Sequence, residues 1–337
     1  IKVCINNLWI ALDTIREINN LYPELIMISV CHSLIKMEHL TNLGSQYTSN
    51  FYEQEVTFKN SDYVVLISKA EKQYYEEFGY NKYKAIPVVI YNSYKPKFDH
   101  LSSNYNYKNN NIGYIGRHVP RKRPELAIRA VVKSGRRDIL VFNMGVDYSK
   151  GGNEYWKELE KKFKDQLNII PFSPDKKKIK EYWKKVGANC ITGIYEPFGY
   201  TMCETLDRCI PAIVQDIDGP KEIVEEIKDH VYMYKVHKKN IDKDIDNLSE
   251  ALNKFWKTSP EERKKKSKLA RKALDKFRPE VIREEWSKLL DETLSDEFKK
   301  NRKLSKDTNN YWSSISSLIS YGYNIYLKKF LDSILKK

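Results

Sequence analysis

Residues 190–224, CITGIYEPFGYTMCETLDRCIPAIVQDIDGPKEIV, decide the fold of this chain. The pattern reads strand, loop, helix, strand, loop, helix. Pro197 cannot continue the first strand, because proline fixes φ and lacks the amide that a strand ladder needs. Pro220 falls in the first turn of a helix, where proline is tolerated. Alternating strands and helices build a parallel sheet whose ligands bind at the carboxyl ends of the strands. The stretch therefore predicts an α/β fold with a site in these loops.

Two carboxylates flank a helix start within this stretch. Glu196 lies in the loop after the first strand, and Glu204 lies inside the helix that follows. The helix start at Gly199, Tyr200 and Thr201 offers unpaired amides and the positive end of the helix dipole, which suits a phosphate. The alternative is that Glu196 and Glu204 are ordinary solvated charges, as most charged side chains are.

The segment Glu-Pro-Phe-Gly at 196–199, together with Glu204, resembles the Glu, seven residues, Glu motif of retaining GT-B glycosyltransferases of family 4. The resemblance extends to three further segments, at 205–206, 211–214 and 219–224. It implies a GT-B fold, in which two Rossmann-like domains with parallel sheets face a cleft. It also implies that Glu196 holds hydroxyls of the donor sugar and that Glu204 holds the nucleotide ribose.

Length and composition limit the number of domains and the kinds of partner that the chain can have. A chain of 337 residues is long enough for two domains with a sizeable core. Its net charge of +14 favours an anionic partner, such as a nucleotide, a nucleic acid or an acidic lipid surface. Five scattered cysteines without paired metal spacing indicate reduced thiols in a cytoplasmic protein. No apolar run approaches the roughly 20 residues that a membrane span requires.

The first 96 residues are interpreted as one Rossmann-like domain. Its expected strands lie at 1–5, 25–30, 63–67 and 85–91. This order resembles the second half of the family's N-terminal, acceptor-side domain, where a first strand and a glycine-rich loop precede these elements. The resemblance implies that the domain at 1–96 is incomplete, either because the sequence is a fragment or because a partner chain completes it.

His32 follows the expected strand at 25–30 and precedes Ser33 and Leu34. A single histidine is more often structural or exposed than functional, and that interpretation is one alternative. The His-Ser-Leu context is similar to that of the sucrose-phosphate-synthase-like members of the family. This similarity implies that His32 lies in the cleft near the transferred sugar.

A polar, low-complexity segment at 97–110 predicts an interdomain linker, and the nucleotide-sugar-binding domain follows at 111–278. Its first strand leads to Gly116 and Arg117, with Lys122 five residues after the arginine, which resembles the family's Gly-Arg loop. Two cations at the end of a strand hold a diphosphate and stabilise the charge that develops as it leaves. The resemblance implies this role for Arg117 and Lys122, and a solvated basic loop is the alternative.

Two further donor-binding positions come from the same resemblance. Gly145 matches the family's glycine turn, and Phe172 begins a segment similar to the one whose backbone faces the nucleotide base. Asp216 and Asp218 superficially match a metal-binding Asp-x-Asp pair. The family has a loop without metal at this position, so we expect no metal site.

Residues 279–337 are interpreted as closing helices followed by a basic amphipathic extension. The segment that begins at 279 resembles the family helix that crosses back to the first domain. The extension at 307–337 predicts a helix that packs on the body, or alternatively a peripheral contact with the inner face of the membrane.

As a whole, the resemblance implies a metal-independent, retaining glycosyltransferase, with a hexosyltransferase favoured. It implies that no cofactor is needed and that the donor is a UDP- or GDP-type nucleotide sugar. The leaving phosphate assists by accepting the proton of the acceptor on the same face of the sugar. The acceptor stays open between a carbohydrate, a lipid-linked glycan and, as a narrower option, DNA. Two alternatives are a catalytically inactive GT-B-like partner or scaffold subunit, and a phage-type nucleic-acid glycosyltransferase supported by charge alone.

Overall fold

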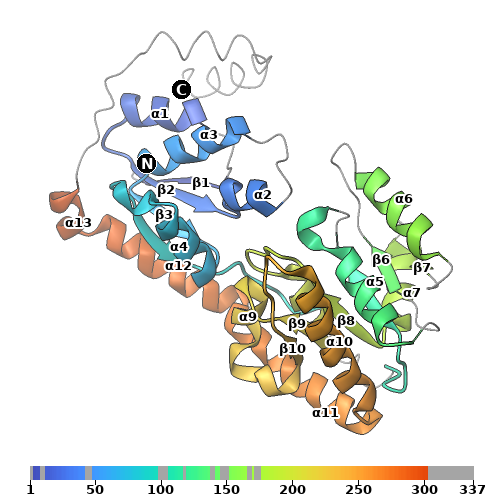
Figure 1. Ribbon diagram of the computed structural model, residues 1–337. Coiled ribbons are helices and arrows are strands. Elements are labelled where there is room, and N and C mark those ends of the chain that lie inside the picture. Colours follow the sequence, from blue (N-terminus) through green and yellow to red (C-terminus); the bar gives the residue numbers. More distant parts are fainter. Residues whose placement is uncertain are drawn as a thin grey trace.

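The computed structural model describes residues 3–7, 12–41, 48–97, 105–116, 119–136, 141–144, 152–164, 169–170 and 176–302. These residues form two α/β units, each built around a parallel sheet (Figure 1). Parallel strands cannot be joined by tight turns and need a crossover, which is why helices alternate with strands along the chain.

The first unit holds four parallel strands in the order β1-β2-β3-β4. They are β1 (Val3–Asn6), β2 (Ile26–Cys31), β3 (Tyr63–Leu66) and β4 (Ile86–Val89). The helices are α1 (Leu12–Leu21), α2 (Ile35–Thr41), α3 (Thr48–Lys59) and α4 (Lys69–Glu77), followed by the 3₁₀ turn η1 (Tyr80–Lys82). Every residue of β2 and β3 is buried, as expected for central strands of a parallel sheet covered on both faces.

The second unit holds six strands in the order β10-β9-β8-β5-β6-β7. They are β5 (Ile112–Ile115), β6 (Val141–Met144), β7 (Ile169–Ile170), β8 (Ala188–Ile191), β9 (Ala212–Gln215) and β10 (Tyr232–Tyr234). The strand order reverses at β5, which pairs with β6 on one side and with β8 on the other. A reversal of this kind leaves a crevice at the carboxyl ends of the two strands, so the loops after β5 and β8 frame a ligand site.

Helices and 3₁₀ turns complete the second unit: η3 (Pro120–Lys122), α5 (Pro124–Lys133), α6 (Gly152–Phe163), α7 (Lys176–Lys185), α8 (Tyr200–Asp207), α9 (Asp218–Val224), η4 (Glu225–His230), α10 (Ile241–Lys257), α11 (Pro260–Ala270) and η5 (Arg271–Phe277). Helix α10 begins at Ile241, because Asn240 caps it by accepting a hydrogen bond from the Lys243 amide at 3.1 Å. Helix α2 and strand β10 were not predicted, since such short elements carry little periodicity.

Two helices at the end of the described chain return to the first unit. Helix α12 (Pro279–Leu294) and helix α13 (Asp296–Asn301) run from the second unit back to the first sheet (Figure 1). Arg302 donates two hydrogen bonds of 2.8 Å to the Asp62 carboxylate. Their side chains are 8% and 3% exposed, so this bidentate ion pair ties the chain to the first sheet away from most solvent.

None of the described helices is long and apolar enough to cross a membrane. The extension at 307–337, with its two alternative interpretations, lies outside the described residues.

Candidate active site

A cavity of about 390 Å³ lies between the two units. The first unit lines it with His32, Ser33, Ile35, Glu38, Ile67 and Asn92, and the second unit with Arg121, Lys122 and residues 196–200. Most of these residues follow the carboxyl ends of strands, so the two parallel sheets present their ligand-binding edges to one another. Five of the predicted site residues meet at this cavity: His32, Lys122, Glu196, Gly199 and Tyr200.

Lys122 and Glu196 are in direct contact at the wall of the cavity. The Lys122 ammonium donates to Glu196 Oε2, and the two side chains are only 16% and 19% exposed. Lys122 ends the turn that follows β5, and Glu196 follows β8; because β5 and β8 are paired, the two loops lie side by side. The contact places a cation and a carboxylate together at the ligand-binding edge of the second sheet.

Helix α8 begins at the same wall. Gly199 adopts the left-handed region, with φ at 110°, and a β-carbon there would lie 3.2 Å from Pro220 Cγ. Glycine is therefore suited to this turn, because other residues rarely adopt that backbone conformation. Gly199 and Tyr200 line the cavity at the start of the helix, where first-turn amides have no intrahelical partner. Thr201 and Glu204 continue along α8 outside the cavity lining.

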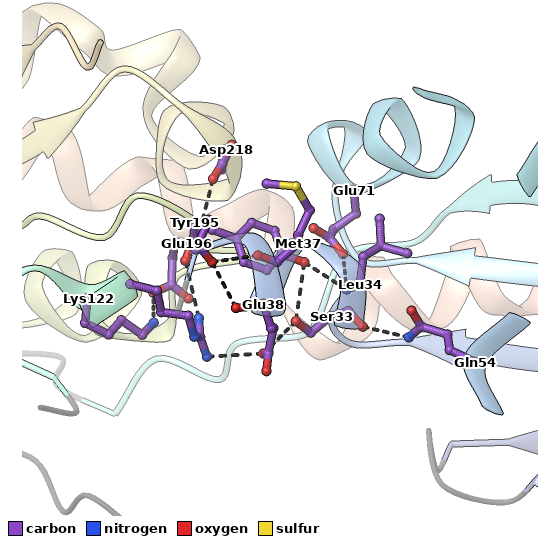
Figure 2. A network of polar contacts seen from close by, with 12 residues as sticks. Ser33, Leu34, Met37, Glu38, Gln54, Glu71, Lys122, Tyr195, Glu196 and Asp218 are labelled. Atoms are coloured by element: carbon purple, nitrogen blue, oxygen red, sulfur yellow. Dashed lines mark hydrogen bonds and ion pairs between the residues drawn. The ribbon is translucent and has the colours of Figure 1, made fainter. Parts of the chain in front are cut away.

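Arg121 joins the two units across the cleft, although the local sequence does not distinguish it from the other cations of its basic loop. Its side chain is 4% exposed, and Nη2 lies 3.2 Å from Glu38 Oε1 of the first unit. Its Nη1 donates to the Tyr195 carbonyl oxygen at 3.3 Å. Figure 2 shows Glu38 in this network, together with Ser33, which donates to the same Glu38 oxygen at 2.7 Å.

Tyr195 anchors the loop before Glu196 to the first unit. Its hydroxyl accepts a hydrogen bond from the Leu34 amide at 2.8 Å, and its side chain is fully buried (Figure 2). The Leu34 amide also donates to Glu71 Oε2 at 3.1 Å. Burial raises the pKa of Glu71 to about 8, because removal from water disfavours the charged form. The start of α2 is thus held by Tyr195 of the second unit and by Glu71, a buried acid on α4 of the first unit.

Asp218 holds the backbone of Glu196 through a hydrogen bond. Its Oδ2 accepts a hydrogen bond from the Glu196 amide at 3.1 Å, and its Oδ1 accepts one from the Tyr74 hydroxyl at 2.6 Å. Burial raises the pKa of Asp218 above its ordinary value. Asp216, its neighbour in the Asp-x-Asp pattern, accepts a hydrogen bond from the Val236 amide at 2.9 Å. Both carboxylates therefore bond to groups of the protein itself.

His32 lies on the first-unit side of the cavity. Its Nε2 is 2.7 Å from Asn7 Oδ1, and burial lowers the pKa of His32 below its ordinary value. An amide oxygen only accepts hydrogen bonds, so Nε2 carries the proton and Nδ1 is left as an acceptor. The neutral imidazole is therefore suited to accept a hydrogen bond from a hydroxyl.

Three predicted site residues, Arg117, Gly145 and Phe172, lie outside the described residues. Their roles stay predictions. Several residues that hold the site together were not predicted as site residues: Ser33, Glu38, Glu71, Arg121, Tyr195 and Asp218. Apart from the Ser33–Glu38 hydrogen bond, the contacts that hold these residues join positions far apart in the sequence, so no local pattern could identify them.

Comparisons with known proteins agree with this architecture. The family profile described as glycosyl transferases group 1 matches residues 97–273. Sucrose-phosphate synthase from Thermosynechococcus elongatus is similar in structure, with a TM-score of 0.67 at 16% identity over 86% of this chain and 73% of that protein. HepE from Anabaena, solved in complex with UDP-glucose, has a TM-score of 0.65 at 17% identity over 86% of this chain and 79% of that protein. No curated protein matches the chain.

TarM from S. aureus is similar over a smaller share of its length. The TM-score is 0.60 at 19% identity, over 85% of this chain and 55% of TarM, so the chain spans about half of TarM. At these identities the likeness concerns the fold. The predicted fold class is confirmed: two Rossmann-like units with parallel sheets face a cleft, as in GT-B proteins.

Proposed function

The chain belongs to the glycosyl transferases group 1, and from this premise we propose that it transfers a sugar from a nucleotide-diphosphate sugar to an acceptor hydroxyl with retention of configuration. One observation carries the proposal: Lys122, Glu196 and the first turn of α8 line one wall of the cavity between the units. The cation and the helix start suit a diphosphate, and the carboxylate suits the hydroxyls of a sugar. The solved structures of HepE with UDP and UDP-glucose support a UDP-type donor, with a GDP-type donor as the alternative.

Donor binding is assigned mainly to the second unit. Lys122 and Arg117 hold the diphosphate, and the first-turn amides at Gly199, Tyr200 and Thr201 add the positive end of the helix dipole. Glu196 binds hydroxyls of the sugar, while Glu204 binds the ribose. Gly145 and Phe172 are assigned to the donor by the family resemblance alone, Phe172 as the start of the segment that is similar to the one facing the nucleotide base.

The reaction proceeds on one face of the sugar. Lys122 and Arg117 stabilise the charge that develops on the leaving diphosphate, and the phosphate oxygen accepts the proton of the acceptor hydroxyl. In this arrangement His32 Nδ1 orients a hydroxyl near the transferred sugar, because the imidazole is neutral and Nε2 is already bonded. Cationic side chains and a helix start neutralise the diphosphate, so catalysis needs neither a metal ion nor another cofactor.

The test is an assay of nucleotide release from a panel of UDP- and GDP-sugars, with the anomeric configuration of the product determined by NMR. We expect release from at least one donor, a retained anomeric configuration and full activity in EDTA. An inverted product would overturn the retaining mechanism, and loss of turnover in EDTA that Mn²⁺ restores would overturn metal independence. A protein that neither binds nor turns over any donor would be an inactive partner or scaffold subunit.

A further inference from the structure

The first-unit wall of the cavity carries hydrogen-bonding groups that the donor does not use. Glu38, on α2, lines the cavity with a side chain that is 23% exposed. Its Oε1 accepts from Ser33 Oγ at 2.7 Å and lies 3.2 Å from Arg121 Nη2. Both of these contacts reach Oε1 and leave Oε2 of the same carboxylate outside them (Figure 2). A carboxylate oxygen at a cavity wall is an acceptor for hydroxyl groups.

Asn92 lies on the same wall, in the segment that follows β4. Its side-chain amide has no hydrogen-bond partner among the described residues, so a ligand has both a donor and an acceptor there. His32 adds the acceptor Nδ1, because its Nε2 is bonded to Asn7 and burial keeps the ring neutral. The wall therefore offers one carboxylate, one amide and one neutral imidazole.

The charges around the cavity argue against an anionic acceptor. Of the two described cations that line the cavity, Arg121 pairs with Glu38 of the first unit, and Lys122, which contacts Glu196, is already assigned to the donor diphosphate. Arg121 is also 4% exposed and donates to a backbone carbonyl, so it has little surface for a phosphate. A second phosphate near the first-unit wall would instead meet the carboxylate of Glu38, which repels it.

We propose that the acceptor is a neutral polyhydroxy compound, such as an unphosphorylated sugar or a polyol, and that Glu38 and Asn92 bind its hydroxyls. This inference rests on the proposed function, since it assigns the wall opposite the donor to the acceptor. The net charge of +14 that favoured nucleic acid as a partner is a property of the whole chain, and the described cavity lining does not share it. Hydrogen bonds to a charged group are stronger than those to a neutral one, so loss of the Glu38 charge should raise the acceptor KM by roughly 10-fold.

The experiment uses the full chain with the active donor found in the nucleotide-release assay. Acceptors are offered as matched pairs: glucose against glucose 6-phosphate, and glycerol against glycerol 3-phosphate, with a DNA oligonucleotide as a third arm. We expect the neutral member of each pair to stimulate nucleotide release and to receive the sugar, while the phosphorylated members and DNA do not.

Two variants separate recognition from structure. Glu38→Gln keeps an oxygen that accepts from Ser33 and Arg121 but loses the charge, so the KM for the neutral acceptor should rise roughly 10-fold, more than the KM for the donor. Glu76→Gln removes an exposed carboxylate of α4 in the same unit and should leave all constants unchanged. Phosphorylated acceptors or DNA used as well as neutral ones, or equal acceptor KM values in Glu38→Gln and Glu76→Gln, would overturn the inference while donor hydrolysis still upholds the proposed function. Absence of both hydrolysis and transfer would overturn the two together.

Discussion

The carboxylate of Asp218 accepts a hydrogen bond from the hydroxyl of Tyr74 across the two units, at 2.6 Å. Asp218 adopts a left-handed backbone with φ at 55°, a conformation that favours Gly, Asn or Asp. Its second oxygen accepts from the amide of Glu196 at 3.1 Å. One buried side chain therefore connects the first unit to the loop that carries a proposed sugar-binding acid.

Tyr74→Phe should lower kcat about 2- to 10-fold, because it removes one hydrogen bond, which contributes about 0.5–1.5 kcal/mol net. Asp218→Asn keeps the backbone conformation but loses its charge, and the two substitutions should be less than additive because they break one contact. A merely structural role would lower the Tm and leave kcat unchanged, which would contradict this prediction. Tyr22→Phe, at a 45% exposed position, is the matched control and should behave as wild type.

Lys122→Ala should lower kcat by about 10²–10³, as expected when one charge-stabilising donor is lost from a leaving group. Arg117→Ala should have an effect of the same order if both cations bind the diphosphate. Circular dichroism should show folded proteins, and Lys133→Ala, which breaks an exposed pair with Asp246, provides the control. Near-normal kinetics in both variants would remove the proposed phosphate site.

Glu196 and Glu204 should respond differently to substitution by glutamine. Glu196 lines the cavity, where positive charge develops on the sugar, so Glu196→Gln should reduce kcat more than it raises KM. Glu204 lies farther along α8 and is assigned to the ribose, which changes little during reaction, so Glu204→Gln should mainly raise the donor KM. Steady-state kinetics on the active donor tests the split. Full kcat in Glu196→Gln would show that its assigned role is wrong.

Glu71→Gln should change how stability depends on pH. Burial raises the pKa of Glu71 to about 8 in the folded chain, from an ordinary value of 4.5. Between these two pH values Glu71 is ionised in the unfolded chain and protonated in the folded chain. The stabilisation that protonated Glu71 gives the fold is therefore complete below about pH 4.5 and is lost as the pH rises toward 8.

Glutamine does not ionise, so the Tm of Glu71→Gln relative to wild type should rise with pH between 5 and 8. Each kcal/mol corresponds to about 2–4 °C for a domain of moderate size. Thermal unfolding of both proteins across this range measures the difference, with Glu76→Gln as an exposed control on the same helix. A Tm difference that stays constant with pH would contradict the raised pKa.

The local sequence pattern was sufficient to predict helix starts around the site. Serine is a preferred residue just before a helix, and the Ser68 hydroxyl accepts from the Glu71 amide at 3.1 Å to cap α4. The expected start near Gly199 matches α8, which begins at Tyr200 directly after that glycine. Short elements such as α2 and β10 were missed, since their burial depends on neighbours that the local sequence does not specify.

The sequence by itself determined the α/β class, the position of the crevice and the residues that the Glu-Pro-Phe-Gly motif marks, because periodicity, proline and glycine act over a few neighbours. Only the tertiary structure decided that Arg121 meets Glu38, that Tyr195 holds the Leu34 amide, and that Asp218 bonds to Tyr74. Each of these contacts joins residues of different units. Their partners are set by how the two sheets face one another, which arises from packing across the cleft and leaves no local signal in the chain.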